Sequence, residues 1–357
     1  MKCPACNNED TNPKRFSYTP TTIDKLKLFD ERDILYCKEC GFGMIEQDVD
    51  SDVLQKYYSS DYSGKAKKQA EINTVDNRTS YSYDIRSISQ LALIRQYIDI
   101  NSETVIAEIG AGPGGILFTL RQNKFNGKYV AFEPQEQAHD WLRNLGGDIE
   151  KDVFTYNSAA KYKNSVDIVI MSHSLEHFSP GDIESIISSV EVMLKNGGVF
   201  FCEVPNADLS LYPNAGEMVV PHLSFFSIES FKKFFGKTKM SLSFINACGN
   251  NQYDKNASEQ IKELNEKGSF IFDLDPENDI LRNRKYHQHL ENSRKKQKQK
   301  QFFINIFLSI FGKKAYMMLI NYIRRYRQKP ITALMADNHF CYEKSREFIR
   351  LIAIKQL

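Results

Sequence analysis

The sequence predicts an α/β fold, in which a mostly parallel sheet carries helices on both faces and a small cysteine-rich unit precedes it. Three observations lead to this prediction. Short apolar runs alternate with helix-like segments from residue 105 onward. A glycine-rich turn, Gly110 to Gly115, follows the first of these runs. Two Cys-x-x-Cys pairs lie before the alternation begins.

The composition is that of a globular protein with no dominant charge. The chain has 357 residues, of which 41% are hydrophobic and 26% are charged, and its formal net charge is +2. Such a charge does not by itself predict a nucleic-acid partner. The sequence has no apolar run of about 18 residues, and Met1-Lys2-Cys3 does not open a signal peptide. Four of the seven cysteines are in paired units, which favours a reducing, cytoplasmic location.

Residues 1–47 form the predicted cysteine-rich unit. Its two pairs are Cys3 with Cys6 and Cys37 with Cys40. Four thiolates presented by two tight turns suit tetrahedral Zn²⁺, so we expect a structural zinc ribbon. Metal binding would supply much of the folding free energy of so small a unit. A redox dithiol and unligated cysteines are the alternatives.

The central motif begins with the apolar run 105–109, read as a buried strand with Glu108 near its end. Glycines in the turn that follows would let a ligand approach the backbone, and residues 116–124 have a helical pattern. A second strand, 128–132, ends in Glu133. A carboxylate at this strand end can accept both ribose hydroxyls of an adenosyl ligand. The alternative role for Glu133 is to cap the helix that follows.

The alternation continues through a short third strand near Asp152 and an apolar fourth strand, 165–171. Ligands in open α/β sheets sit at the carboxyl ends of strands, where Glu176 and His177 follow the fourth strand. A helix, 180–194, and three further strands complete the prediction, with the fifth, sixth and seventh strands at 199–204, 241–248 and 346–354. His222 lies on a loop between the fifth and sixth strands.

The spacing Glu108-x-Gly-x-Gly-x-Gly114, with an acid at the end of the next strand, resembles motif I of the class I S-adenosylmethionine (SAM)-dependent methyltransferases. Leu-Glu-His at 175–177 and Lys-Asn-Gly-Gly at 195–198 resemble other segments of that family. The resemblance implies a Rossmann-like seven-stranded domain that binds SAM. The implied SAM-binding residues are Glu108, Gly110, Ala111, Gly112, Gly114, Glu133, Pro134, Asp152, Ser172 and His173, with Asp152 next to the adenine amino group.

The zinc ribbon and the segment around His222 resemble bacterial sugar methyltransferases. This resemblance implies methyl transfer to a small-molecule or glycan acceptor, such as a sugar hydroxyl of a nucleotide-sugar or surface polysaccharide. His222 and His177 are then the candidate general bases, with Glu176 as their orienting partner. A pocket-lining or helix-capping histidine is the alternative role. C-methylation of a keto-sugar is an alternative activity, although Pro221 stands where sugar C-methyltransferases have an acid before the histidine. A non-catalytic SAM-binding scaffold is a further alternative.

Four regions are expected: the zinc ribbon at 1–47, a linker or lid at 48–80, the methyltransferase domain at 81–249 plus 346–357, and a helical insertion at 250–345. Within the insertion, residues 282–329 hold fourteen Lys or Arg and one acid, interleaved with two apolar runs. This pattern suits a peripheral contact with the inner face of a membrane or a homo-oligomer contact. A helical subdomain with its own core and a solvated basic face is the alternative. Nucleic acid is disfavoured because the aromatic residues lie within the apolar runs.

Overall fold

The computed structural model describes residues 2–9, 16–18, 32–46, 49, 51–61, 87, 90–207, 222–248, 309 and 348–356. The predicted helical insertion, 250–345, lies outside these residues apart from residue 309, and its basic segment 282–329 does so with the same exception. Most of the predicted linker or lid beyond residue 61 is also outside the described part of the chain.

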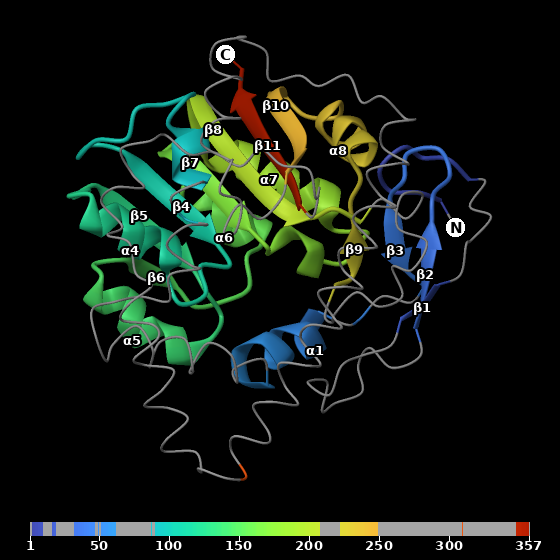
Figure 1. Ribbon diagram of the computed structural model, residues 1–357, viewed down its shortest axis with the longest axis horizontal. Coiled ribbons are helices and arrows are strands. Elements are labelled where there is room, and N and C mark those ends of the chain that lie inside the picture. Colours follow the sequence, from blue (N-terminus) through green and yellow to red (C-terminus); the bar gives the residue numbers. More distant parts are fainter. Residues whose placement is uncertain are drawn as a thin grey trace. The chain divides into compact units, whose positions relative to one another are not determined.

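A seven-stranded sheet forms the centre of the described fold, with strand order β10-β11-β8-β7-β4-β5-β6 (Figure 1). β11 pairs antiparallel with both β8 and β10, and the remaining pairs are parallel. This arrangement confirms the predicted mostly parallel sheet of seven strands. The bounds are β4 Val105–Ile109, β5 Lys128–Phe132, β6 Asp148–Glu150, β7 Val166–Ser172, β8 Leu194–Pro205, β10 Met240–Cys248 and β11 Phe348–Lys355.

Helices cover both faces of the sheet because successive side chains of each strand point to opposite faces. Ile106 and Ile168 belong to one buried cluster, which includes side chains of α4, α5 and the helical residues 90–94. Ala107 and Val169, one position further along the same strands, belong to the other cluster, with α6, α7 and α8. The helices are α4 Gly115–Gln122, α5 Glu136–Asn144, α6 Tyr156–Ala160, α7 Ile183–Met193 and α8 Ile228–Phe235.

A second, four-stranded sheet has the order β1-β2-β3-β9 and includes the cysteine-rich unit. Its first three strands are β1 Phe16–Tyr18, β2 Arg32–Tyr36 and β3 Gly43–Ile45, whereas β9 Ser224–Phe225 comes from the loop after the fifth strand of the large sheet. β9 lies beside β3 (Figure 1), and their antiparallel register pairs Phe225 with Gly43. The N-terminal unit and the segment that follows His222 therefore share one sheet, which the sequence did not predict.

The junction between α7 and β8 differs from the prediction. The helix was expected to reach residue 194 and the next strand to begin at residue 199. In the structure α7 ends at Met193 and β8 begins at Leu194, because Leu194 already pairs with Val166 of β7. The glycine pair lies inside this strand, where Gly197 has a positive φ of 77°. The sequence located the end of the helix to within one residue, but it did not predict that strand pairing with β7 would begin at Leu194.

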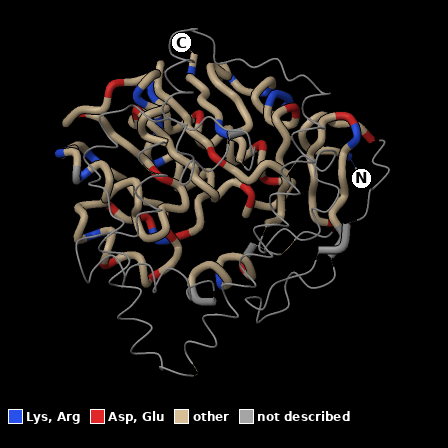
Figure 2. The backbone as a smooth tube through the Cα atoms, viewed as in Figure 1, with Lys and Arg blue, Asp and Glu red and all other residues tan. Residues whose placement is uncertain are grey.

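Charged residues of both signs alternate along the described backbone, and neither sign gathers on one side of it (Figure 2). None of the helices in the described residues is both long and apolar enough to cross a bilayer. Two short segments complete the elements near the site: α1 Ser51–Lys56, which continues into the π-helical turn η1 Tyr57–Asp61, and the 3₁₀ turn η2 Leu175–His177.

Candidate active site

A pocket of about 510 Å³ opens where β4, β5 and β7 end at their carboxyl sides. Eight of the ten residues predicted to bind the cofactor line it: Glu108, Gly110, Ala111, Gly112, Glu133, Pro134, Ser172 and His173. Gly114 and Asp152 are not among the lining residues, although Val153 and Phe154, which follow Asp152, are. The volume lies within the range of about 300–1,000 Å³ that small-molecule pockets occupy.

The glycine turn is built from residues in the left-handed backbone region. Gly110 has φ 76°, and a Cβ placed on it would lie 2.6 Å from the Cβ of Ser174. Gly114 has φ 78°, and a Cβ there would lie 2.7 Å from Leu142 of α5. Gly112 has φ 53° and open space where a side chain would be, beside the pocket. Gly110 and Gly114 thus permit close packing, whereas Gly112 leaves room for a ligand.

Glu133 connects the end of β5 to the glycine turn. Its Oε2 accepts a hydrogen bond from the backbone N–H of Gly112, and its Oε1 accepts one of 2.8 Å from the N–H of Gln135. Each carboxylate oxygen retains a further lone pair that could accept a ribose hydroxyl. Burial raises the pKa of Glu133 to about 6, and the two N–H donors oppose that rise. The carboxylate is therefore ionised at neutral pH and already held in position.

Glu108 is buried beneath the same pocket and accepts a hydrogen bond from the hydroxyl of Tyr129 on β5. Burial raises the pKa of Glu108 to about 8, while the hydrogen bond from Tyr129 lowers it. Sequence reasoning named Glu108 but missed Tyr129. Alternation along residues 128–132 could have found it, because every second side chain of β5 faces the same side of the sheet as its counterparts in β4.

The candidate catalytic residues gather around the turn η2, which follows β7. Glu176 is buried, and His173 Nδ1 and His222 Nε2 lie 3.4 and 3.9 Å from its Oε1. Burial alone would raise the pKa of Glu176, but the contact with His173 and the charges of His177 and the other two histidines hold it at about 2. Neither carboxylate oxygen has a hydrogen-bond partner of good geometry among the described residues. The structure thus brings together all three residues predicted to be catalytic.

The two predicted bases differ in their relation to the pocket. His177 lines it, and so does Tyr58 of η1, whose ring centroid is 5.7 Å from that of His177. His222 lies behind His177, with ring centroids 5.1 Å apart, and is not among the lining residues. Burial lowers the pKa of His222 to about 3, although the charge of Glu176 opposes this shift. His222 is therefore neutral near pH 7 and a weak base, and its predicted catalytic role remains a prediction.

A buried ion pair that the sequence did not predict lies next to this site and contacts His173. Arg350 of β11 donates from Nε to Glu203 of β8, and the two residues are paired in the strand register. Glu203 Oε1 also lies 3.1 Å from Nε2 of His173 and 2.9 Å from Nε2 of Gln90, which donates in turn to Ser172. The signal in the sequence was a charged residue inside each of two apolar strands.

His173 occupies a strained position between these two groups of residues. It is a non-glycine residue with φ 54°, in the sparsely populated left-handed region. Its two ring nitrogens approach the carboxylates of Glu176 and Glu203, and its backbone N–H donates to the carbonyl of Glu203 at 2.8 Å. A strained backbone that is held by several contacts is typical of ligand and active sites.

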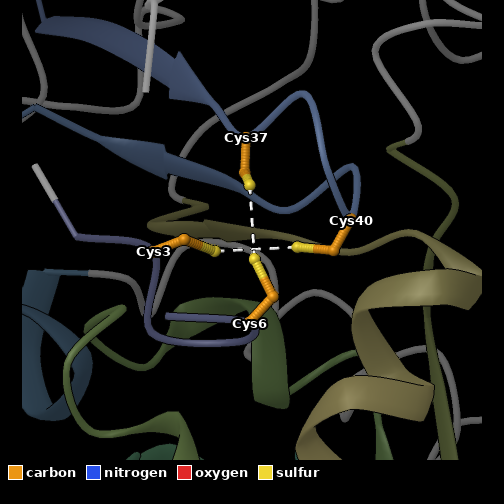
Figure 3. Close-up of side chains that lie close together, drawn as sticks. All are labelled: Cys3, Cys6, Cys37 and Cys40. Atoms are coloured by element: carbon orange, nitrogen blue, oxygen red, sulfur yellow. Dashed lines mark hydrogen bonds between the residues drawn. The ribbon is translucent and has the colours of Figure 1, made fainter. Parts of the chain in front are cut away.

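The four cysteines of the N-terminal unit converge from two turns (Figure 3). The sulfurs of Cys3 and Cys40 are 3.6 Å apart, as are those of Cys6 and Cys37, so neither pair is a disulfide. A Zn²⁺ ion with tetrahedral bonds of about 2.3 Å would place its sulfurs about 3.8 Å apart. The hydrogen bond from Cys40 and backbone N–H groups lower the pKa of Cys3 to about 5. The cluster is therefore compatible with zinc in both distance and chemistry.

Residues 83–238 match a family model described as a methyltransferase domain. This match covers the glycine turn, the pocket-lining strand ends, η2 and His222. The match spans less than half of the chain, and the described fold of those residues agrees with it. They support the SAM-dependent methyltransferase class that the glycine turn predicts. No curated protein matches the chain.

Solved structures with a detectable likeness include three that concern methyltransferases. A chain from the complex of the Haloferax volcanii Trm112 methyltransferase activator with a methyltransferase is 12% identical over 83% of this chain and 95% of that one, with a TM-score of 0.45. Haemonchus contortus phosphoethanolamine N-methyltransferase 2 is 14% identical over 88% and 62%, with a TM-score of 0.44. Geranyl diphosphate methyltransferase is 14% identical over 45% and 61%, with a TM-score of 0.36. At these scores and identities the likenesses do not bear on the acceptor of this chain.

Proposed function

We propose that the chain transfers a methyl group from SAM to a hydroxyl of a small-molecule or glycan acceptor bound in the 510 Å³ pocket. The observation that carries this proposal is the joining of Glu133 to the N–H of Gly112 in a pocket that His177 also lines. One part of the pocket is suited to an adenosyl ligand, and an ionisable side chain that could meet an acceptor lies in the same cavity.

The reaction forms a bond between the acceptor oxygen and the methyl carbon and breaks the bond between that carbon and the sulfonium sulfur. The electron pair of the broken bond neutralises the sulfonium, and the acceptor proton leaves. Because the methyl group of a sulfonium is already electrophilic, the protein mainly aligns the two reactants. His177 is the member of the predicted pair of bases that lines the pocket, so we place it next to the acceptor hydroxyl, where it could receive the proton.

A sugar hydroxyl remains our proposed acceptor, as part of a nucleotide-sugar or a surface polysaccharide. Polar side chains from outside the glycine turn also line the pocket, and they suit an acceptor with several hydroxyl groups: Tyr58, Ser179, Asp182 and Ser185. C-methylation of a keto-sugar is the alternative, and it needs a group that removes a proton from carbon. Burial lowers the pKa of His222 to about 3, which makes it a weak base, so His177 would have to take the proton in either reaction.

The decisive experiment measures production of S-adenosylhomocysteine by the full-length protein with a panel of nucleotide-sugars and glycans. Methyl transfer to any of them supports the enzyme, and mass spectrometry of the product locates the new methyl on oxygen or carbon. We expect His177→Ala and His222→Ala to lower kcat far more than SAM affinity. Tight SAM binding without turnover, for every acceptor tried, would instead favour a scaffold role.

Zinc at Cys3, Cys6, Cys37 and Cys40 is part of this proposal, as a structural ion. The convergence of the four sulfurs supports it. A closed set of four thiolates would leave no coordination position for a substrate. Metal analysis of the purified protein should give at least one zinc per chain, and replacing both Cys37 and Cys40 by serine should remove one zinc per chain.

The basic segment 282–329 supports one further proposal, that it contacts an anionic membrane surface or a second copy of the chain. Only its sequence carries the argument, through fourteen basic residues that flank two apolar runs. Flotation of the full-length protein with vesicles rich in anionic lipid tests the first contact, and sedimentation tests the second. Failure to float and a monomeric mass would reject both.

A further inference from the structure

We propose that Glu176, His177 and His222 bind a divalent transition-metal cation beside the pocket, at a second metal site apart from the four cysteines. The ligand atoms of these three residues all lie within 4.8 Å of one another. Bonds of about 2.0–2.2 Å to nitrogen and oxygen would require these atoms to lie within about 4.4 Å, so small side-chain shifts would close the site.

The carboxylate of Glu176 is the strongest reason to expect a cation. The residue is 1% exposed, and neither of its oxygens has a hydrogen-bond partner of good geometry within the described part of the chain. A buried carboxylate is costly unless it is paired with a charge or coordinates a metal. Of the two histidines proposed as ligands, His222 places its Nε2 3.9 Å from Oε1 of Glu176, too far for a hydrogen bond but within the span of two metal–ligand bonds. His173, which approaches the same oxygen at 3.4 Å, is not part of the proposed set.

The backbone holds the three side chains in place from two separate segments. Glu176 and His177 belong to the turn η2, and His222 lies two residues before β9. The N–H of Leu223 donates to the carbonyl of Glu176 at 2.9 Å, which fixes the neighbour of His222 against η2. On the other side, Leu223 accepts from the N–H of Ile45 at 3.1 Å. These two backbone hydrogen bonds hold Glu176 and the neighbour of His222 together, although the two ligands lie 46 positions apart.

Two imidazoles and one carboxylate define the class of ion. This set suits Mn²⁺, Fe²⁺, Co²⁺ or Zn²⁺ better than Mg²⁺ or Ca²⁺, which prefer oxygen ligands throughout. Neutral imidazole and ionised carboxylate are the forms that ligate a metal. Three protein ligands leave coordination positions open, and His177 places them beside the pocket.

The open positions would accept oxygen atoms of the acceptor, and this part of the inference rests on the proposed methyl transfer. A hydroxyl bound to a divalent cation loses its proton more readily, as bound water does. The proton would pass to water before the oxygen attacks the methyl carbon, and His177 would act as a ligand instead of a base. Acceptors with two neighbouring hydroxyls, which can chelate one ion, would be preferred.

Manganese binding tests the site without relying on activity. Full-length protein with its zinc content measured is titrated with Mn²⁺, and free Mn²⁺ is followed by electron paramagnetic resonance. Mn²⁺ is a hard ion that favours carboxylate and avoids thiolate, so the cysteine cluster does not compete for it. We expect one Mn²⁺ per chain, with affinity reduced at least tenfold in Glu176→Gln and in His222→Ala. The control Glu229→Gln changes a half-exposed glutamate on α8 and should bind as the wild type does.

Two results would overturn the cation site: no Mn²⁺ binding by the wild type at concentrations on the order of 1 mM, or equal affinity in the wild type and both ligand variants. His222→Ala keeps the test valid if Glu176→Gln does not fold, and SAM titration shows whether each variant retains the cofactor site. Bound Mn²⁺ in a protein that transfers no methyl group supports the site and counts against the proposed function. Methyl transfer by a wild type that binds no Mn²⁺ counts against the cation alone.

Discussion

Replacing Arg350 by methionine should cost more stability than almost any other single charge removal in the described fold. The guanidinium is 2% exposed and its partner, Glu203, is 0% exposed, so both charges were taken out of water when the strands paired. Methionine keeps most of the volume but leaves Glu203 buried without its arginine. Breaking a buried pair in this way costs about 3–5 kcal/mol, against a total stability of about 5–15 kcal/mol for a typical protein. We expect the midpoint of thermal unfolding to fall by roughly 6–20 °C.

Urea unfolding followed by circular dichroism measures the loss, and Arg143→Met is the matched control. Arg143 also forms a direct ion pair, with Asp140 at 2.7 Å, but the two side chains are 49% and 92% exposed. Exposed pairs contribute about 0–1 kcal/mol, so this variant should unfold close to the wild type. Adding Glu203→Gln to Arg350→Met should recover part of the loss, because the neutral amide no longer needs a counter-charge. Equal losses in the two arginine variants would refute the assignment of Arg350 and Glu203 as a buried support of the site.

Three further outcomes follow from the pocket and the cysteine cluster. Glu133→Gln should weaken SAM binding about 10–100-fold, as measured by calorimetry. In the wild type, SAM affinity should fall as the pH drops below the Glu133 pKa of about 6, because SAM binds the ionised carboxylate. A SAM affinity that does not change over this pH range would count against the role of Glu133. Gly110→Ala and Gly197→Ala both place an alanine at a positive φ, which costs about 1–2 kcal/mol. Only the new Cβ at residue 110 would also clash, at 2.6 Å from the Cβ of Ser174, so Gly110→Ala should lower the urea midpoint more than Gly197→Ala does. Cys40→Ser should lower zinc content and kcat while leaving SAM affinity within a few-fold of the wild type. If SAM affinity fell as much as kcat, the cysteine cluster would support the whole domain and not only the acceptor side.

The sequence predicted the elements whose signal is local. The alternation of apolar runs placed the strands of the large sheet, with Glu133 at the end of the second, and the glycine turn placed Glu108; both acids line one pocket. Each of these signals lies within about ten residues of the feature it predicts, because periodicity and turn chemistry act over that range.

Contacts between distant residues were not predictable in this way. Arg350 and Glu203 are 147 positions apart, and Ser227 and Cys40, whose hydroxyl and carbonyl form a 2.6 Å hydrogen bond, are 187 apart. A charge inside an apolar strand signals a buried partner but does not identify it. His222 Nε2 lies 3.9 Å from Glu176 Oε1, but the burial that lowers the pKa of His222 to about 3 depends on packing that no local pattern reveals.

The shared small sheet gives the cysteine cluster a role beyond its own folding. β3 follows Cys40 closely and pairs with β9, and β9 begins two residues after His222. Any free energy that metal binding adds to the order of β3 is therefore passed to the segment that holds His222 against Glu176. The glycine turn and Glu133 follow strands of the large sheet and have no strand in this small sheet. Zinc at the four cysteines would thus support the acceptor side of the site, while the SAM side depends on the large sheet. Loss of zinc should therefore leave SAM binding largely unchanged.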